Sequence, residues 1–562
     1  MRFRGRAALF VTAGFLVATA LRVAPILPRA DREIPVWAKG GYDVPTQAFL
    51  LGWGWKALWR DPASVFDVPI FHPERRTLTY MDSMIGEVAA ASTIIAATGS
   101  IAAGYNFLLA MATFLSAWFT YRLARSTGAE RRGAFLAGLL FAFSTYTLSN
   151  ADFLNQLQIE FIPLGLYFGI RFHEGGHTRH AIGLGATLAV QAYFGWYYTC
   201  MLVFALLLLA IYATLRRVPL VPRRGRVGLA LLVPAVALLI APVLVPMLEQ
   251  RHAMPAFRRT LGQAALYSAD LLDYVRASDR VIDPFRLGLP AGINALFPGI
   301  VMIALGALGV RTIRRSGQGV PGYFPFLAVS SFILSLGPLL HVAGQRYWIP
   351  LPYIAAYYLV PFLSVTRAPF RMAVLVFAAG AVLASLGYRA LDRYLCSRAP
   401  MWRGPVFAAT VAVALLSAWP APYGFVRLPT AESLEPAYRW LKGQNPRGPL
   451  LELPTPATDG GETTTQGLRQ YRVLLHGVPR LDGCSGFVSP RYREFRRDIQ
   501  AFPDSAALSL AGATGARFVL IHYADYPPKE REHLRTRVGE ETRLTLKAVF
   551  GSDAVYRLAG TP

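Results

Sequence analysis

The chain has 562 residues, of which 54% are hydrophobic and only 16% are charged, and its mean hydropathy is +0.36. Soluble proteins carry about 25% charged residues, so this composition excludes a disordered protein, a collagen and an ordinary cytosolic enzyme. The net charge of +24 does not indicate a nucleic-acid partner, because the arginines form short clusters between apolar runs, as in the cytoplasmic loops of membrane proteins. We therefore expect an all-α polytopic membrane protein.

The first apolar run covers about residues 7–27 and follows three closely spaced arginines. No clear small-residue cleavage site comes after it, so we predict a retained first helix with a cytoplasmic N-terminus rather than a signal peptide. A long outer loop, 28–100, comes next. Its apolar stretch 83–98 is short and is interrupted by Glu87, so we expect it to lie in the membrane surface without crossing.

Ten further apolar runs alternate with polar loops. Together with the first helix they predict about eleven transmembrane helices of roughly 17–23 residues each. If the 83–98 helix does not cross, all five arginine-rich loops fall on the cytoplasmic side, which fits the positive-inside rule. The runs lie near 102–124, 133–150, 157–172, 181–197, 198–215, 228–247, 296–312, 323–341, 369–388 and 404–421.

The C-terminal part of the chain has a different character. From about residue 422 charged residues return, and short alternating runs predict strands at 449–453, 517–522 and 554–558, with helices at 431–441 and 503–510. We therefore predict two domains: a transmembrane domain, 1–421, which includes the outer loop 28–100, and a small soluble α/β domain, 422–562. An odd number of spans places this second domain in the periplasm or outside the cell.

Two acids of the first outer loop are candidate catalytic residues, Asp43 and Asp82. A carboxylate that follows the first membrane helix, beside glycine and aromatic residues, is well placed to act as a base on a hydroxyl at the membrane surface. The alternative is that both acids are solvated loop residues or helix caps.

Polar side chains gather at a later outer turn, where Asn155, Gln156 and Gln158 lie between two apolar runs. They could hydrogen-bond a sugar or satisfy the exposed backbone of the turn. An aromatic cluster at 193–198 includes Tyr197, which belongs either to an aromatic belt or to a stacking wall for a sugar or lipid.

Basic residues in predicted outer loops are not explained by the positive-inside rule, so their presence there requires another explanation. Arg258 and Arg259 lie in one outer loop, and Arg367 and Arg371 lie at the mouth of a predicted helix. Guanidinium groups bind phosphate bidentately, and two arginines four residues apart share a face if the helix has begun. We interpret them as ligands of a lipid phosphate, the alternative being snorkelling toward headgroups.

Several common motifs are missing from the sequence. There is no Walker loop, no dinucleotide fingerprint, no Gly-x-Ser-x-Gly and no His-Glu-x-x-His. These absences argue against an ATP-driven pump, a serine hydrolase and a zinc protease. We predict no metal-ligating residues and no nucleotide cofactor, and we leave the use of a divalent metal open.

Five short motifs follow one another along this topology: Gly41-Tyr42-Asp43, Asn155-Gln156-Leu157-Gln158, Ile162-Pro163-Leu164, Tyr267-Ser268-Ala269-Asp270 and Arg367-Ala368-Pro369-Phe370-Arg371. With the long first outer loop and the outer C-terminal domain, the arrangement resembles bacterial membrane glycosyltransferases of the GT-C superfamily. More narrowly, it resembles the group related to mannosyl- and aminoarabinose-transferring enzymes and to YfhO-like proteins.

The resemblance implies a polyprenyl-phosphate sugar donor in the membrane lipid and an inverting transfer on the outer face of the bacterial inner membrane. Asp43 would be the base, with Asp82 replacing or assisting it. Arg367 and Arg371, with Arg258 or Arg259, would hold the donor phosphate. The acceptor would be a glycan, a lipid or a protein. Two alternatives remain open: a transporter or flippase of lipid-linked sugars, and a non-catalytic assembly protein of the cell envelope.

Overall fold

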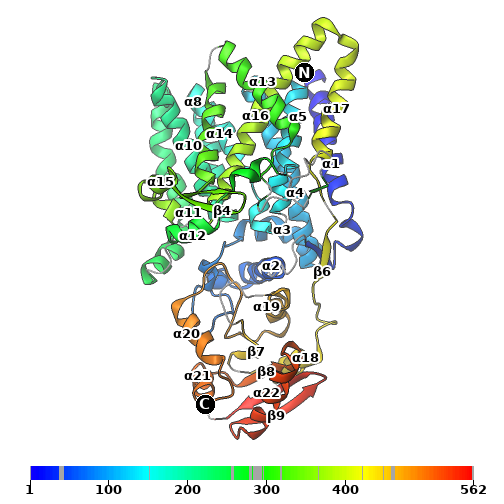
Figure 1. Ribbon diagram of the computed structural model, residues 1–562, viewed down its shortest axis with the longest axis vertical. Helices are drawn as coiled ribbons and strands as arrows, with labels where there is room; N and C mark the ends of the chain where they lie inside the picture. The colour runs from blue at the N-terminus through cyan, green and yellow to red at the C-terminus, as the bar shows by residue number, and fades with distance from the viewer. Residues whose placement is uncertain are drawn as a thin grey trace. The chain divides into compact units, whose positions relative to one another are not determined.

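The computed structural model divides the chain into two compact units (Figure 1). Unit 1 comprises Met1–Pro28, Asn106–Leu244 and Arg258–Gly424, and unit 2 comprises Arg29–Tyr105, Val245–Phe257 and Phe425–Pro562. The structure describes residues 2–36, 43–150, 152–254, 259–276, 281–282, 294, 296–316, 319–364, 366–420, 422–446, 448–456 and 463–559.

Unit 1 is built mainly from helices, and most of each predicted apolar run lies on one of them. One run differs from the prediction: 323–341 gives a helix that stops at Ser335 and continues into a strand from Leu339. The helices are α1 (Arg2–Val23), α4 (Ile101–Ser126), α5 (Arg131–Ala142), α6 (Thr145–Ser149), α7 (Leu154–Leu157), α8 (Phe161–Gly175), α9 (Thr178–Phe194), α10 (Trp196–Leu215), α11 (Arg226–Ala253), α12 (Leu261–Leu266), α13 (Ile300–Ser316), α14 (Tyr323–Ser335), α15 (Tyr353–Leu359), α16 (Ala373–Arg398) and α17 (Arg403–Leu416).

Within the described ranges, four helices are both long and apolar enough to cross a membrane. They are Ile101–Ser126, Trp196–Leu215, Arg223–Ala253 and Pro369–Arg398. The count of about eleven spans stays a prediction, because several of the other helices are shorter than a bilayer core requires.

Helix α16 forms the centre of unit 1. In its most apolar window 83% of the residues are buried, against 6% for the window of α11. Glycines let α16 approach α13 closely, since a Cβ on Gly387 would lie 1.9 Å from the carbonyl oxygen of Leu305 and one on Gly309 would lie 2.1 Å from that of Leu383. Small residues at such crossings are typical of membrane helices.

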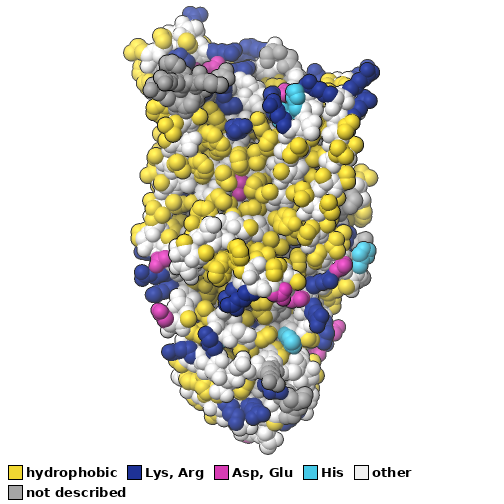
Figure 2. Space-filling view, turned by 180° about the vertical axis from the view of Figure 1, so that it is seen from behind, with side chains coloured by type: hydrophobic (Ala, Val, Ile, Leu, Met, Phe, Trp, Pro, Cys, Tyr) yellow, Lys and Arg dark blue, Asp and Glu magenta, His cyan; other side chains and the backbone are white. Residues whose placement is uncertain are grey.

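Charged and apolar side chains occupy different parts of the surface of unit 1. Figure 2 shows yellow hydrophobic side chains over a broad stretch of it, with dark-blue Lys and Arg gathered along its upper edge. Arginine-rich loops that are distant in sequence meet: Arg393 Nε lies 3.4 Å from Glu130 Oε1, and Arg132 and Arg403 both contact the carboxylate of Asp392. Two of the five arginine-rich loops therefore contact each other, and the position of all five on the cytoplasmic side stays a prediction.

A small β-hairpin in unit 1 explains one of the sequence motifs. Strands β3 (Leu339–Val342) and β4 (Gln345–Pro350) pair antiparallel. The Asp270 carboxylate accepts hydrogen bonds from the backbone N–H groups of Ala343, at 3.1 Å, and Gly344, at 2.7 Å. Both residues have positive φ angles, so the motif that ends in Asp270 holds a tight turn in place.

Unit 2 contains a four-stranded mixed sheet in the order β7-β8-β10-β9. Strand β7 (Leu450–Leu453) runs parallel to β8 (Phe518–His522), whereas β10 (Asp553–Leu558) is antiparallel to both β8 and β9 (Leu544–Phe550). The sequence predicts β7, β8 and β10 but not β9, whose residues are mostly solvent-exposed. The helices are α18 (Pro436–Gln444), α19 (Thr464–His476), α20 (Pro490–Ile499), α21 (Ser505–Ala513) and α22 (Pro528–Glu540).

The first outer loop also contributes helices to unit 2. Helices α2 (Asp43–Arg60) and α3 (Ile85–Thr98) belong to it, and α2 packs closely on α19, where a Cβ on Gly52 would lie 2.4 Å from the side chain of Leu474. From the sequence, loop 28–100 is predicted to belong to the transmembrane domain, whereas by its contacts most of this loop groups with the C-terminal region. At 14 residues, α3 is about 21 Å long, too short to cross a bilayer core of about 30 Å unaided.

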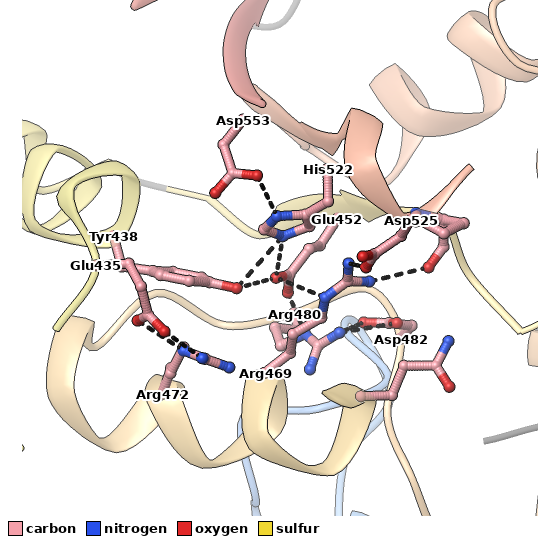
Figure 3. A network of polar contacts seen from close by, with 12 residues as sticks. Glu435, Tyr438, Glu452, Arg469, Arg472, Arg480, Asp482, His522, Asp525 and Asp553 are labelled. Carbon is pink, nitrogen blue, oxygen red and sulfur yellow. Dashed lines mark hydrogen bonds and ion pairs between the residues drawn. The ribbon is translucent and has the colours of Figure 1, made fainter. Parts of the chain in front are cut away.

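A buried network of charged side chains joins three strands of the unit 2 sheet to the segment that follows α19 (Figure 3). Glu452 on β7 is fully buried, with Oε2 at 3.0 Å from Arg480 Nε and Oε1 at 2.9 Å from His522 Nε2. His522 Nδ1 lies 2.9 Å from Asp553 Oδ1, and Arg480 Nη2 lies 2.7 Å from Asp482 Oδ1. Each buried charge of this set therefore has a partner of opposite sign.

The network sets the protonation of its members. Burial alone would raise the pKa of Glu452, but the charge of Arg480 and a hydrogen bond from His522 hold that pKa well below its ordinary value. Burial would lower the pKa of His522, yet its hydrogen bonds to Asp553 and Glu452 raise it. These directions favour a protonated imidazole between two carboxylates.

Candidate functional site

The segment that carries Arg367 and Arg371 joins α15 to α16 in unit 1. Pro369 starts a 3₁₀ turn, Pro369–Met372, that runs into α16. Ala368 has φ −123° and ψ 89°, outside the α-helical region that a following proline disfavours. The helix has therefore not begun at Arg367. The shared helix face, which was expected only if the helix began there, is not formed by Arg367 and Arg371.

Tyr197, in the first turn of α10, organises this segment. Its hydroxyl accepts hydrogen bonds from the backbone N–H groups of Arg367, at 2.5 Å, and Ala368, at 3.1 Å. The guanidinium carbon of Arg371 lies 4.4 Å from the centre of the Tyr197 ring, and that of Arg367 lies 4.5 Å from the ring of Tyr267. The structure thus brings three predicted residues, Arg367, Arg371 and Tyr197, into one group.

Arg371 is the most informative member of this group. Its exposed fraction is 9%, and its Nε is buried without a hydrogen-bond partner. Throughout the part of the chain that the structure describes, no acid lies within ion-pair distance of Arg371; its cationic contacts are the faces of Tyr197 and Phe370. A buried cation without a counter-charge is costly, and this one is suited to an anionic ligand.

The predicted polar turn connects to the same place through tyrosines. The Tyr198 hydroxyl donates to the carbonyl oxygen of Gln156, at 2.8 Å, and lies 3.0 Å from the Tyr146 hydroxyl. The Tyr146 hydroxyl in turn lies 3.4 Å from the carbonyl oxygen of Arg371. The chain of contacts fixes the backbone of the turn against the start of α16.

Several buried polar atoms of this turn have no hydrogen-bond partner in the described structure. They include Oε1 of Gln156, both side-chain polar atoms of Gln158 and both carboxylate oxygens of Glu160. Gln191 on α9 also leaves its Oε1 unpaired, while its Nε2 lies 3.5 Å from the carbonyl oxygen of Gln158. Buried polar atoms are normally satisfied by protein, water or ligand, so these groups can form hydrogen bonds to water or to a polar ligand.

Asn155 and Arg259 are placed in the same unit. Asn155 is half-buried next to Gln156, and its carbonyl oxygen lies near Gly195, just before α10. The backbone N–H of Arg259 donates to the carbonyl oxygen of Ser364, at 3.0 Å, so Arg259 adjoins the segment that leads to Arg367. Arg258 lies outside the described residues.

Both candidate bases belong to unit 2. Asp43 is half-buried in the first turn of α2, where a carboxylate is stabilised by the helix dipole. Asp82 is half-buried between a 3₁₀ turn, Thr77–Tyr80, and the start of α3. Both acids lie within loop 28–100 and outside the four-stranded sheet. Their role as bases stays a prediction.

Three residues of this group, Glu160, Gln191 and Tyr146, are not among the site residues predicted from the sequence. The first two could have been found, because each is a polar residue inside an apolar run, and such residues are rare in membrane helices unless they serve a function. Tyr146 could not, since a tyrosine in an apolar run has no distinguishing local signal.

Comparison with solved structures identifies the fold. The mycobacterial arabinofuranosyltransferase AftD superposes with a TM-score of 0.61 at 14% identity, over 99% of this chain and 40% of that one. The chain has a GT-C-like fold. The archaeal oligosaccharyltransferase AglB of Archaeoglobus fulgidus, solved with an inhibitory peptide and a dolichol-phosphate, matches with a TM-score of 0.51 at 13% identity, over 98% of this chain and 74% of that one.

The GT-C-like fold is what these comparisons establish. No protein-family model matches the sequence, and no curated protein does. The chain spans 40% of the length of AftD. Because one fold hosts many functions, the narrower group named in the sequence analysis stays a prediction.

Proposed function

We propose that this chain transfers a sugar from a polyprenyl-phosphate donor to an acceptor hydroxyl at the outer face of the bacterial inner membrane. One observation carries the proposal: in a GT-C-like fold, Arg371 is buried with no acid partner among the described residues. A lipid phosphate supplies the missing negative charge, and Arg367, held by the same Tyr197, supplies a second guanidinium. Bidentate arginine–phosphate contacts are among the strongest polar contacts available.

The proposed reaction is a single displacement at the anomeric carbon. The acceptor oxygen forms a bond to that carbon while the bond to the donor phosphate oxygen breaks, which inverts the configuration. Asp43, with Asp82 as the second candidate, accepts the proton of the acceptor hydroxyl. The leaving polyprenyl phosphate carries the electron pair, and Arg367 and Arg371 stabilise its charge.

The remaining parts of the proposal follow from this reaction. Asn155, Gln156 and Gln158 hydrogen-bond the sugar, Arg259 adds positive charge near the phosphate, and the acceptor is a glycan, a lipid or a protein. The N-terminus is cytoplasmic, and the domain 422–562 faces the periplasm or the exterior. In the described ranges no three His, Cys, Asp or Glu side chains are grouped to hold a metal ion, and no step here is assigned to one.

The decisive experiment replaces Asp43 with Asn in a strain that otherwise lacks the protein, followed by mass spectrometry of lipid-linked and envelope glycans. Loss of a general base lowers the rate by roughly a hundredfold to ten-thousandfold, so the product glycan should disappear. Asp61→Asn is the matched control, because Asp61 is an exposed acid just after the last residue of α2. Normal product with Asp43→Asn would reject the base assignment.

The same strains separate the enzyme from a flippase of lipid-linked sugars. A flippase can use the same arginines but requires no base at the acceptor, so it should tolerate Asp43→Asn and fail with Arg371→Met. Cysteines placed at 43 and 367 in a background without the native cysteines test whether the two groups face one site. An enzyme of this kind should give cross-links with short bifunctional reagents.

A further inference from the structure

A cavity of about 480 Å³ lies in unit 1 where two helices end. Its walls come from the last turns of α8 and α10, the loop that follows α10, and the start of the 3₁₀ turn before α14. Cavities of this size hold small ligands. The lining residues include His173, Glu174, Leu209, Tyr212, Arg216 and Val218.

Polar contacts between its walls hold the cavity open. The Tyr212 hydroxyl donates to the carbonyl oxygen of Gly319, at 2.9 Å, and His173 Nδ1 lies 2.6 Å from the carbonyl oxygen of Leu220. Next to it, Arg224 Nε donates to the carbonyl oxygen of Gly175, at 2.5 Å. These contacts join segments from three parts of the chain, so the cavity is formed before any ligand arrives.

The charge around the cavity is strongly positive. Residues 171–226 contain seven arginines and one acid, Glu174. Glu174 lies 3.2 Å from Arg171, which offsets its charge, and Arg216 is among the residues that line the cavity. The positive charge also affects the exposed His177, because nearby Arg224 lowers the pKa of its imidazole. The surroundings therefore select an anion.

The position of the cavity along α10 points to a lipid. Tyr197 and Arg216 lie at opposite ends of this helix, 19 residues apart, which corresponds to about 29 Å. That is about the thickness of a bilayer core, and α10 is apolar enough to cross one; a membrane-spanning α10 would place the cavity at headgroup level in the leaflet opposite Arg371. Exposed apolar side chains lie close in sequence, with Leu215 at 68% and Val218 at 49% exposure, and Leu209 provides an apolar wall.

We propose that this cavity binds the headgroup of an anionic phospholipid, with its phosphate at Arg216 and its glycerol against the apolar wall. Basic pockets between membrane helices are suited to such headgroups. The site is separate from the proposed donor site and does not depend on it. Binding there would hold the ends of α8 and α10 together from the opposite leaflet.

The test is native mass spectrometry of the full-length protein in mild detergent, with phosphatidylglycerol or phosphatidylcholine added. We expect selective retention of phosphatidylglycerol. Arg216→Gln should weaken it about fivefold, since one arginine contributes about 1 kcal/mol to such contacts. The control, Arg217→Gln, removes a neighbouring exposed charge that does not line the cavity and should change retention less than twofold. Equal loss in both variants, or equal retention of phosphatidylcholine, would overturn the proposal.

A second pair of variants tests the cavity without changing any charge. Val218→Trp should narrow it and lower phosphatidylglycerol retention, whereas Leu215→Trp, at an exposed position outside the lining, should not. An excess of inorganic phosphate should fail to displace the lipid. Displacement by phosphate, or unchanged retention with Val218→Trp, would mean that the cavity is not a lipid-headgroup site.

Discussion

Two buried arginines of this chain have opposite surroundings. Arg480 in unit 2 is fully buried between the carboxylates of Glu452 and Asp482. Arg371 in unit 1 is 9% exposed and has aromatic faces but no acid partner in the described part of the chain. Both must recover the cost of leaving water, but only Arg480 does so within the protein.

The presence or absence of an acid partner distinguishes an arginine that stabilises the fold from one that is available to a ligand. A buried cation that is neutralised by its own chain contributes to folding, and removing its partner destabilises the fold. A buried cation that is left without an acid is held ready for a charge from outside. Substitutions at the two kinds of arginine site should therefore differ in their effects on stability and on ligand binding.

The largest effect is expected from Glu452→Gln. It leaves Arg480 and His522 without their shared counter-charge, and breaking a buried ion pair costs about 3–5 kcal/mol. Hydrogen exchange of the amides of β7 and β8 in the full-length protein should report this loss. The control is Glu494→Gln on the exposed face of α20, and equal protection in the two variants would contradict a structural role for the network.

Arg371→Met should have the reverse pattern. The unliganded fold should be as stable as the wild type or more stable, because an uncompensated buried charge is removed. Donor binding should fall by roughly 10- to 150-fold, the equivalent of about 1.5–3 kcal/mol for charge-assisted hydrogen bonds. Binding of a polyprenyl-phosphate sugar and thermal unfolding measure the two effects separately.

Arg346→Met is the matched control for that variant, since Arg346 lies on the exposed strand β4. Loss of stability with Arg371→Met, together with unchanged donor binding, would make Arg371 a structural residue like Arg480.

Tyr197→Phe should have a smaller effect on the same site. It removes the hydroxyl that accepts the N–H groups of Arg367 and Ala368 but keeps the ring under Arg371. A lost hydrogen bond is worth about 1 kcal/mol, so donor affinity should fall roughly fivefold. Tyr193→Phe, whose hydroxyl donates to the carbonyl oxygen of Leu239, is the control. A fall as large as that of Arg371→Met would mean that the hydroxyl itself binds the donor.

The smallest expected effect is a pH dependence of unit 2. The pKa of His522 is raised in the folded state, so its contribution to stability is complete below about pH 6.5, its ordinary pKa, and is lost as the pH rises through the folded-state pKa. His476 acts in the other direction, because burial lowers its pKa to about 4. Its neutral form is favoured, so stability falls as the pH drops below about 6.5.

The measurement therefore compares the wild type with His522→Gln from about pH 6.5 to about pH 8.5, where His476 stays neutral. The wild type should lose hydrogen-exchange protection in β8 as the pH rises, beyond the intrinsic rate change, and the variant should not. His533→Gln, at an exposed position of α22, is the control. A pH slope that survives in His522→Gln would assign it to other groups.

Much of the fold follows from local sequence patterns. Apolar runs predict the helices of unit 1, and alternation predicts β7, β8 and β10, because burial imposes a period on the chain that a single sequence displays. Strand β9 was missed since most of its residues are solvent-exposed. The burial of α16 and the exposure of α11 could not be distinguished, because both helices are apolar and only packing decides which is central.

The sequence by itself determined that the chain is rich in apolar runs, that its arginines cluster between them, and that Arg367 and Arg371 stand four residues apart. Those properties depend on residue type and spacing alone. Only the tertiary structure decided which arginine has an acid partner, that Tyr197 holds Arg367, and that Asp270 fixes a turn. The physical reason is that such contacts are set by the packing of whole elements and can join residues far apart in the sequence, 170 positions in the case of Tyr197 and Arg367, and no local pattern records them.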